Sequence, residues 1–263
     1  MSLPDSFLQS IIRSLDSLDV VGVTMSGSFA RNQAGRYSDV DIQRYVHVLP
    51  ESRYEHYMLQ YVQDRLVSVK TLTVEEAQKS LTRPDKAIWA IPGLRQMNIL
   101  LDKEGILAGL KRAAAQADWS RLQPAADEFA ADELMGYAEE VHKLLDGLEQ
   151  DRESKVLYAV WGMVEGMART LAVQRGLLIL SENEFFQMVQ DSAGRASDWT
   201  RSFRIAAGMD PAPLSQSPYR VRGEAALRLY AYTARPLLES LPERYRKIVA
   251  TALKLIQESG IRV

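Results

Sequence analysis

The residues most able to do chemistry lie close together near the start of this 263-residue chain. The segment 27–42 reads GSFARNQAGRYSDVDI and carries a Gly-Ser pair, Arg31 and two aspartates. A turn at Gly27 and Ser28 that leads into a helix would offer unpaired backbone amides, a hydroxyl and the positive end of a helix dipole to phosphate. Arg31, one turn further on, would add positive charge.

The two aspartates of this segment, Asp39 and Asp41, suit a metal ion. The stretch 39–48 alternates in polarity like a β-strand, and residues two apart on a strand share a face. The two carboxylates would therefore lie side by side as oxygen ligands for Mg²⁺. A solvated hairpin or an ordinary tight turn would explain the glycine or the charges taken singly. Their combination in this order favours a phosphate and metal site.

Short strands and helices must position these residues. The spacing of apolar residues predicts a helix at 3–18 and another at 105–116. Runs rich in β-branched residues predict strands at 19–25, 39–48, 64–74 and 95–102. The first part of the chain therefore alternates between strands and helices.

From residue 127 onward the chain fits helices alone. Five runs have helical spacing of apolar residues: 127–148, 154–174, 182–191, 224–238 and 243–258. The change of character falls near Pro124. We predict an α+β fold, in which residues 1–120 form a domain with a mixed, twisted sheet and residues 121–263 form a helical bundle domain.

Composition excludes several classes of protein. Lys and Arg number 32 against 34 Asp and Glu, giving a net charge of -2, so nucleic acid and anionic membranes are not expected partners. The chain has no cysteine, which excludes disulfides and zinc–thiolate sites. With no secretory signal or long apolar span, the expected location is the cytoplasm.

Other conspicuous side chains are assigned to packing or to the surface. The three histidines are too scattered along the sequence to form a metal cluster. Within the helix predicted at 154–174, we expect Trp161, Met163 and Met167 to pack in a core. Glu165 would then lie on an exposed polar stripe of the same helix.

The motif resembles that of nucleotidyltransferases of the DNA polymerase beta superfamily, which is Gly-Ser, a spacer, and Asp-x-Asp or Asp-x-Glu. It stands here as Gly27-Ser28 and Asp39-Val40-Asp41. The chain is most similar to antibiotic nucleotidyltransferases of the kanamycin type, through Gly-Ser-x-x-Arg, the glycine before Tyr-Ser-Asp, and the acidic pair. Weaker similarity continues through ILLDKEG and ADELMGYAEEVHK, so it extends into both halves.

This resemblance implies transfer of a nucleoside monophosphate from an NTP, with ATP the first choice, to a hydroxyl of a small molecule. Two Mg²⁺ ions held by Asp39 and Asp41 would clamp the attacking oxygen and the leaving pyrophosphate. Gly27, Ser28 and Arg31 would bind the nucleotide phosphates. An aminoglycoside-like antibiotic is the implied acceptor. The helical domain would serve substrate binding and dimerisation, with sites shared in a homodimer.

One departure from the family pattern concerns a third carboxylate. Active members carry it on a following strand, and Ser68 stands there, on the face that the alternation assigns to Leu66, Ser68 and Lys70. A serine cannot replace an ionised ligand. The alternative function is therefore a catalytically impaired nucleotide-binding module. A transferase acting on nucleic acid is disfavoured by the charge balance and by the lack of a basic, aromatic tract.

A second departure concerns the general base. In kanamycin-type enzymes a glutamate of the helical domain has this role, and Gly136 stands at the matching position. Glu133 and Glu140 lie one turn to either side, since residues three or four apart share a helix face. Glu139 is less well placed. We assign Glu140 as the catalytic base.

Overall fold

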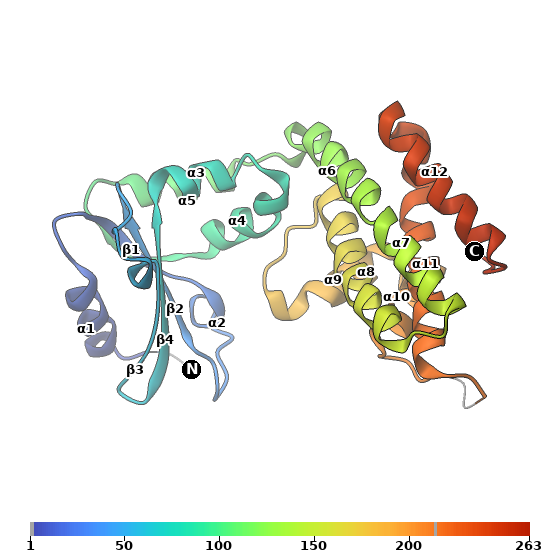
Figure 1. Cartoon of the computed structure of the whole chain (residues 1–263). Coiled ribbons are helices and arrows are strands. Elements are labelled where there is room, and N and C mark those ends of the chain that lie inside the picture. Colours follow the sequence, from blue (N-terminus) through green and yellow to red (C-terminus); the bar gives the residue numbers. More distant parts are fainter. Residues whose placement is uncertain (1–2, 213–214) are drawn as a thin grey trace. The chain divides into compact units, whose positions relative to one another are not determined.

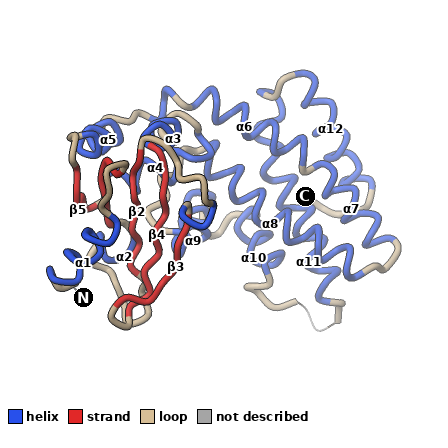
Figure 2. Tube along the Cα trace, turned by 60° about the vertical axis from the view of Figure 1, so that its left-hand side comes forward, coloured by secondary structure: helices blue, strands red, loops and turns tan. Residues whose placement is uncertain are grey.

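The computed structural model describes residues 3–212 and 215–263 and divides the chain into two compact units. Unit 1 comprises Met1–Leu122 and Leu178–Glu182, and unit 2 comprises Gln123–Leu177 and Asn183–Val263. In the described part of the chain, strands occur only in unit 1 (Figure 2). The predicted α+β fold, an N-terminal mixed sheet followed by a helical region, is confirmed.

Unit 1 is built on a five-stranded sheet with the order β3-β4-β2-β1-β5. Four of its strands, β1 to β4, are labelled in Figure 1. The strands are β1 (Val20–Met25), β2 (Val40–Val46), β3 (Tyr57–Val62), β4 (Arg65–Thr73) and β5 (Asn98–Asp102). β2 and β4 run parallel, and the other neighbouring strands are antiparallel. The sequence did not predict β3, an edge strand whose apolar side chains are largely exposed, so it lacks the usual alternation.

Helices pack on both faces of this sheet. Their bounds are α1 (Asp5–Leu15), α2 (Gly27–Ala30), α3 (Val74–Ser80), α4 (Pro84–Gln96) and α5 (Ile106–Ala115), with short 3-10 turns η1 (Arg53–Glu55) and η2 (Trp119–Arg121). Val40 and Ile42 of β2 pack in one cluster with α1. Tyr45 points to the other face and is fully buried in a second cluster, formed with α3, α4 and α5. Asp41 shares the face of Tyr45 but is only partly buried.

The predicted face assignment of β4 is confirmed. Val67 and Val69 are fully buried in the cluster that contains Ile42. Ser68 therefore lies on the opposite face, where its hydroxyl contacts Asp41. The period of two along the strand was enough to make this prediction.

The regular secondary structure of unit 2 is helical in its described residues, with turns and loops between the helices. The elements after unit 1 are α6 (Gln123–Gly136), α7 (Ala138–Glu149), α8 (Glu153–Gln174), η3 (Glu182–Glu184), α9 (Phe185–Ala193), α10 (Asp198–Ala207), α11 (Pro218–Ala234), η4 (Arg235–Ser240) and α12 (Glu243–Glu258). The one helix predicted over 127–148 is two helices that meet at Tyr137, directly after Gly136. Helix α10, which begins with Ser197 capping the amide of Thr200, was not predicted.

Helix α8 forms much of the core of unit 2. It is long and apolar enough to cross a membrane by length and composition, yet 67% of its apolar window is buried inside the protein. Met163 and Met167 are fully buried, as predicted. The prediction for Trp161 was wrong, because its side chain is 72% exposed. Trp161 lies one turn from the exposed Tyr158 and Glu165, so it belongs to the outward stripe of the helix.

We expect Gly166→Ala to destabilise unit 2. An added methyl group at this position of α8 would lie 2.0 Å from Cζ of Tyr137, so the ring would have to move. Overpacking of this kind costs about 1–3 kcal/mol of unfolding free energy, measurable by urea denaturation. Gly136→Ala is the matched control, because its methyl would meet no atom within 4 Å. Equal stability of the two variants would contradict this packing.

Candidate functional site

The Gly-Ser turn is held directly against β2. The amide of Ser26 donates to the carbonyl of Asp41 at 2.9 Å, which ties the end of β1 to the strand that carries the acid. Gly27 has a φ of +66°, which glycine adopts at little cost. A methyl group on Gly27 would lie 1.8 Å from Oδ2 of Asp41. The glycine backbone and the carboxylate are therefore in direct contact.

The element that follows the turn differs from the predicted helix. α2 is a single turn of four residues, too short for a substantial dipole. The first amides of any helical turn still lack partners within the helix. Binding of an anion here would depend on those amides and on the hydroxyl of Ser28.

The acidic pair lies at the start of β2. Asp39 comes directly before the strand and Asp41 is its second residue. Ser68 lies opposite Asp41 on β4, and its hydroxyl donates to Asp41 Oδ1 at 3.2 Å. Burial raises the pKa of Asp41, and the charge of Asp39 raises it further, while the Ser68 hydrogen bond and the charge of Arg31 oppose the rise. The charge of Arg31 thus acts on Asp41.

This donor set fits a hard divalent cation. A partly buried carboxylate beside a second one is destabilised by desolvation and repulsion, and a bound cation would relieve both. Carboxylate oxygens are the ligands that Mg²⁺ prefers. Over residues 3–212 and 215–263, no three His, Cys, Asp or Glu side chains are grouped to hold a metal. Asp39 and Asp41 would therefore share the ion with phosphate and water oxygens.

A third carboxylate acts on Asp41 from a distant part of the sequence. The segment Leu178–Glu182 belongs to unit 1, where the amide of Ile179 donates to the carbonyl of Ile88 at 2.8 Å. Glu182, at the end of this segment, adds a further rise to the pKa of Asp41. The sequence assigned Glu182 only to the start of a helix. No local pattern links it to Asp41.

Glu140, the predicted base, lies on α7 of unit 2. Lys143 donates to its Oε1 at 2.7 Å and also pairs with Glu139 at 3.0 Å, and these bonds raise the pKa of Lys143. The other carboxylate oxygen, Oε2, is buried with no hydrogen-bond partner in the described structure. Gly136 is exposed at the end of α6 and contributes no functional group.

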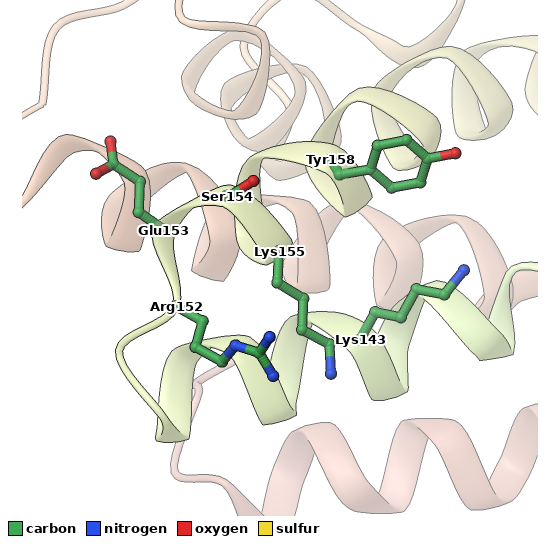
Figure 3. Close-up of a pocket in the computed structure, with 6 residues that line it drawn as sticks. All are labelled: Lys143, Arg152, Glu153, Ser154, Lys155 and Tyr158. Carbon is green, nitrogen blue, oxygen red and sulfur yellow. The ribbon is translucent and has the colours of Figure 1, made fainter.

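A hollow of about 610 Å³ in unit 2 is lined by residues of α7 and the start of α8 (Figure 3). Three of its six lining residues are cations: Lys143, Arg152 and Lys155. Lys143 pairs with Glu139 and Glu140, and Lys155 pairs with Asp146. These partners offset the charge, so the hollow lacks the surplus positive charge that an anion site needs.

Part of this chain is similar to known proteins. Residues 8–90 match the family model described as nucleotidyltransferase domain, a range that contains the Gly-Ser turn and the acidic pair. A nucleotidyltransferase-like protein from Exiguobacterium sibiricum 255-15 has a similar fold, with a TM-score of 0.53 at 12% identity over 91% of this chain and 77% of that chain. A search of curated proteins finds no match. Within unit 1, residues 8–90 are therefore similar to a nucleotidyltransferase domain.

Proposed function

We propose that this protein transfers a nucleoside monophosphate from an NTP, with ATP the first choice, to a hydroxyl group of a small molecule. The observation that carries the proposal is the contact of the Gly27 turn with Asp41, beside Asp39 and Arg31. The match to a nucleotidyltransferase domain supports an NTP as one substrate. Pyrophosphate would be the second product.

Different residues of unit 1 would bind the metal ions and the phosphates of the nucleotide. Asp39 and Asp41 would hold Mg²⁺, with two ions expected. When bound, such ions stabilise charge on the attacking and leaving oxygens of an in-line displacement. The amides at Gly27 and the Ser28 hydroxyl would donate to the β and γ phosphates, and Arg31 would offset their charge.

Glu140 is the proposed acceptor of the hydroxyl proton. Oε2 of Glu140 has no hydrogen-bond partner in the described structure, so a substrate hydroxyl that reached it would supply the missing donor and could pass its proton to the carboxylate. Lys143, bonded to Oε1, would hold the carboxylate in one orientation. Glu133, on α6 one turn before Gly136, is the alternative base.

Pyrophosphate release tests the proposal. Each of the four NTPs is supplied with Mg²⁺ or Mn²⁺, with and without hydroxyl-bearing compounds, and Asp39→Asn serves as the blank. The resemblance to kanamycin-type enzymes makes aminoglycosides one arm of this panel. Release that needs an acceptor and vanishes in the blank supports transfer. An inability to bind any nucleotide would overturn it.

A second candidate function, a nucleotide-binding module with impaired catalysis, is favoured by Ser68 at the position of the expected third carboxylate. Nucleotide binding without release under any condition would support this candidate. The same resemblance suggests a homodimer, which light scattering would test separately.

Ser68→Asp discriminates between these functions. A third carboxylate beside Asp41 should lower the melting temperature without metal, through repulsion, and raise Mg²⁺ affinity roughly tenfold, since added ligand charge tightens such sites. Pyrophosphate release by Ser68→Asp should exceed that of wild type if the missing third carboxylate limits turnover. Ser68→Asn, of equal size but uncharged, is the control. An Mg²⁺ affinity equal to that of the control would contradict the metal assignment.

A further inference from the structure

A row of exposed apolar side chains lies beside the candidate site. Leu59 of β3 pairs with Ser68 of β4, and Ser68 pairs with Asp41 of β2. Directly paired residues point to the same face of a sheet, so Leu59 and Asp41 share one face. Tyr57 and Tyr61, two residues to either side of Leu59, share it too. These three residues are named here the aromatic row.

The aromatic row is not needed for the core. Tyr57, Leu59 and Tyr61 are 58%, 55% and 76% exposed. Met58 and Val62, on the opposite face of the same strand, are partly buried and pack against the core that contains Ile42. The strand is therefore anchored by its other face. Tyrosines that stay exposed present flat apolar rings with polar ends, as binding surfaces do.

The in-line geometry of the proposed reaction places the acceptor toward this row. The leaving pyrophosphate would be held by α2, which follows β1, and β1 lies on one side of β2. Attack and departure occur on opposite sides of the phosphorus. The acceptor therefore lies on the other side of β2, over β4 and β3. Strands are about 4.8 Å apart, so the row starts about 10 Å from Asp41, within the span of a small molecule.

Charge on this face selects among acceptors. Lys70 of β4 is exposed and pairs in register with Tyr57 on one side and Gln43 on the other. No carboxylate in the described structure forms an ion pair with Lys70. The β3 and β4 residues of this face include no acid, so a polycation over the row would meet a lysine there, and the nearest carboxylates would be those at Asp41, namely Asp39, Asp41 and Glu182.

We propose that the aromatic row and Lys70 form the acceptor subsite, and that the acceptor is a planar aromatic hydroxyl compound, neutral or anionic. This inference rests on the proposed function and replaces the polycationic acceptor suggested by resemblance. The hydroxyl oxygen would form a bond to the α-phosphorus as the bond to the bridging oxygen breaks. The electron pair leaves with pyrophosphate, and the hydroxyl proton passes to a carboxylate base.

Binding of 1-naphthol-4-sulfonate, a planar anion with a hydroxyl, tests the subsite. Its fluorescence is titrated with the full chain in the presence of Mg²⁺ and α,β-methylene ATP. The double variant Tyr57→Ser/Tyr61→Ser should weaken binding roughly tenfold or more, because two ring contacts are lost. Tyr54→Ser is the matched control, since Tyr54 is 89% exposed but lies on η1, outside the row. Lys70→Gln should weaken naphthol sulfonate more than neutral 1-naphthol.

Each contrary outcome is distinct. If wild type binds neither naphthol, or binds kanamycin more tightly, the acceptor class is wrong. If the double variant loses ATP-analogue affinity equally, the row holds the nucleobase. If it converts a dimer to a monomer, the row is a subunit interface. Any of these results would overturn the assignment of the aromatic row as the acceptor subsite. Failure of the proposed function would instead appear as no binding of the ATP analogue, with Asp41→Asn indistinguishable from wild type.

Discussion

Asp41→Asn is expected to lower Mg²⁺-dependent nucleotide binding and pyrophosphate release roughly 100-fold or more, because bound metal contributes several kcal/mol to such reactions. The amide keeps the size of the carboxylate and can still accept from Ser68, but it lacks the charge that a cation needs. Calorimetric titration with Mg²⁺ and a non-hydrolysable ATP analogue measures the binding. The fold should persist, because the core face of β2 is unchanged.

The same substitution is expected to raise thermal stability at pH 7 in metal-free buffer. Burial and the charge of Asp39 raise the pKa of Asp41 above its ordinary 3.8, so the folded protein holds this proton more tightly than the unfolded chain. The protonated carboxyl of Asp41 therefore stabilises the folded state below pH 3.8. This contribution is lost as the pH rises through the pKa that Asp41 has in the folded protein. The neutral amide escapes that loss. The gain in melting temperature should shrink toward pH 3.

Asp64→Asn is the matched control for both measurements. Asp64 lies in the exposed turn between β3 and β4 at a φ of +61°, which asparagine tolerates. It should change neither nucleotide binding nor the melting temperature. Unchanged nucleotide binding in Asp41→Asn would remove the metal assignment. A lower melting temperature at pH 7 would contradict the direction of the pKa shift.

The sequence predicts β2 and β4 by their alternation, whereas it does not predict β3. In β2 and β4 the alternation of Val40 and Ile42, and of Val67 and Val69, reports burial directly. β3 has apolar side chains on both faces and only one face packed, so its pattern carries no period. Trp161 was misassigned for a related reason: an apolar side chain on an apolar helix gives no sign that it faces outward.

The candidate site likewise has a part that the sequence predicts and a part that it does not. The Gly-Ser turn and the acidic pair are close in sequence, so residue types and spacing predict that they meet. The pairing of Ser68 with Asp41 needs only the period of β4 and the parallel register. The approach of Glu182 and the position of the aromatic row depend on chain topology, for which the sequence offers no local signal.

A comparably large loss is expected from Gly27→Ala. The new methyl group would overlap Oδ2 of Asp41, and the carboxylate has to move by an ångström or more to accommodate it. Displacing a catalytic group by about 1 Å costs on the order of 100-fold in rate. The left-handed φ of +66° adds strain of about 1–2 kcal/mol to the folded state. Nucleotide titration and urea unfolding measure the two effects separately.

Gly35→Ala is the control within the same motif, because its methyl would lie 4.0 Å from Oγ of Ser38, an ordinary contact. It should bind nucleotide like wild type. If Gly27→Ala acts through the Asp41 carboxylate, its loss should not add to that of Asp41→Asn, since the second change finds the metal ligand already removed. Full additivity in the double variant would instead show that Gly27 matters only through its own amide.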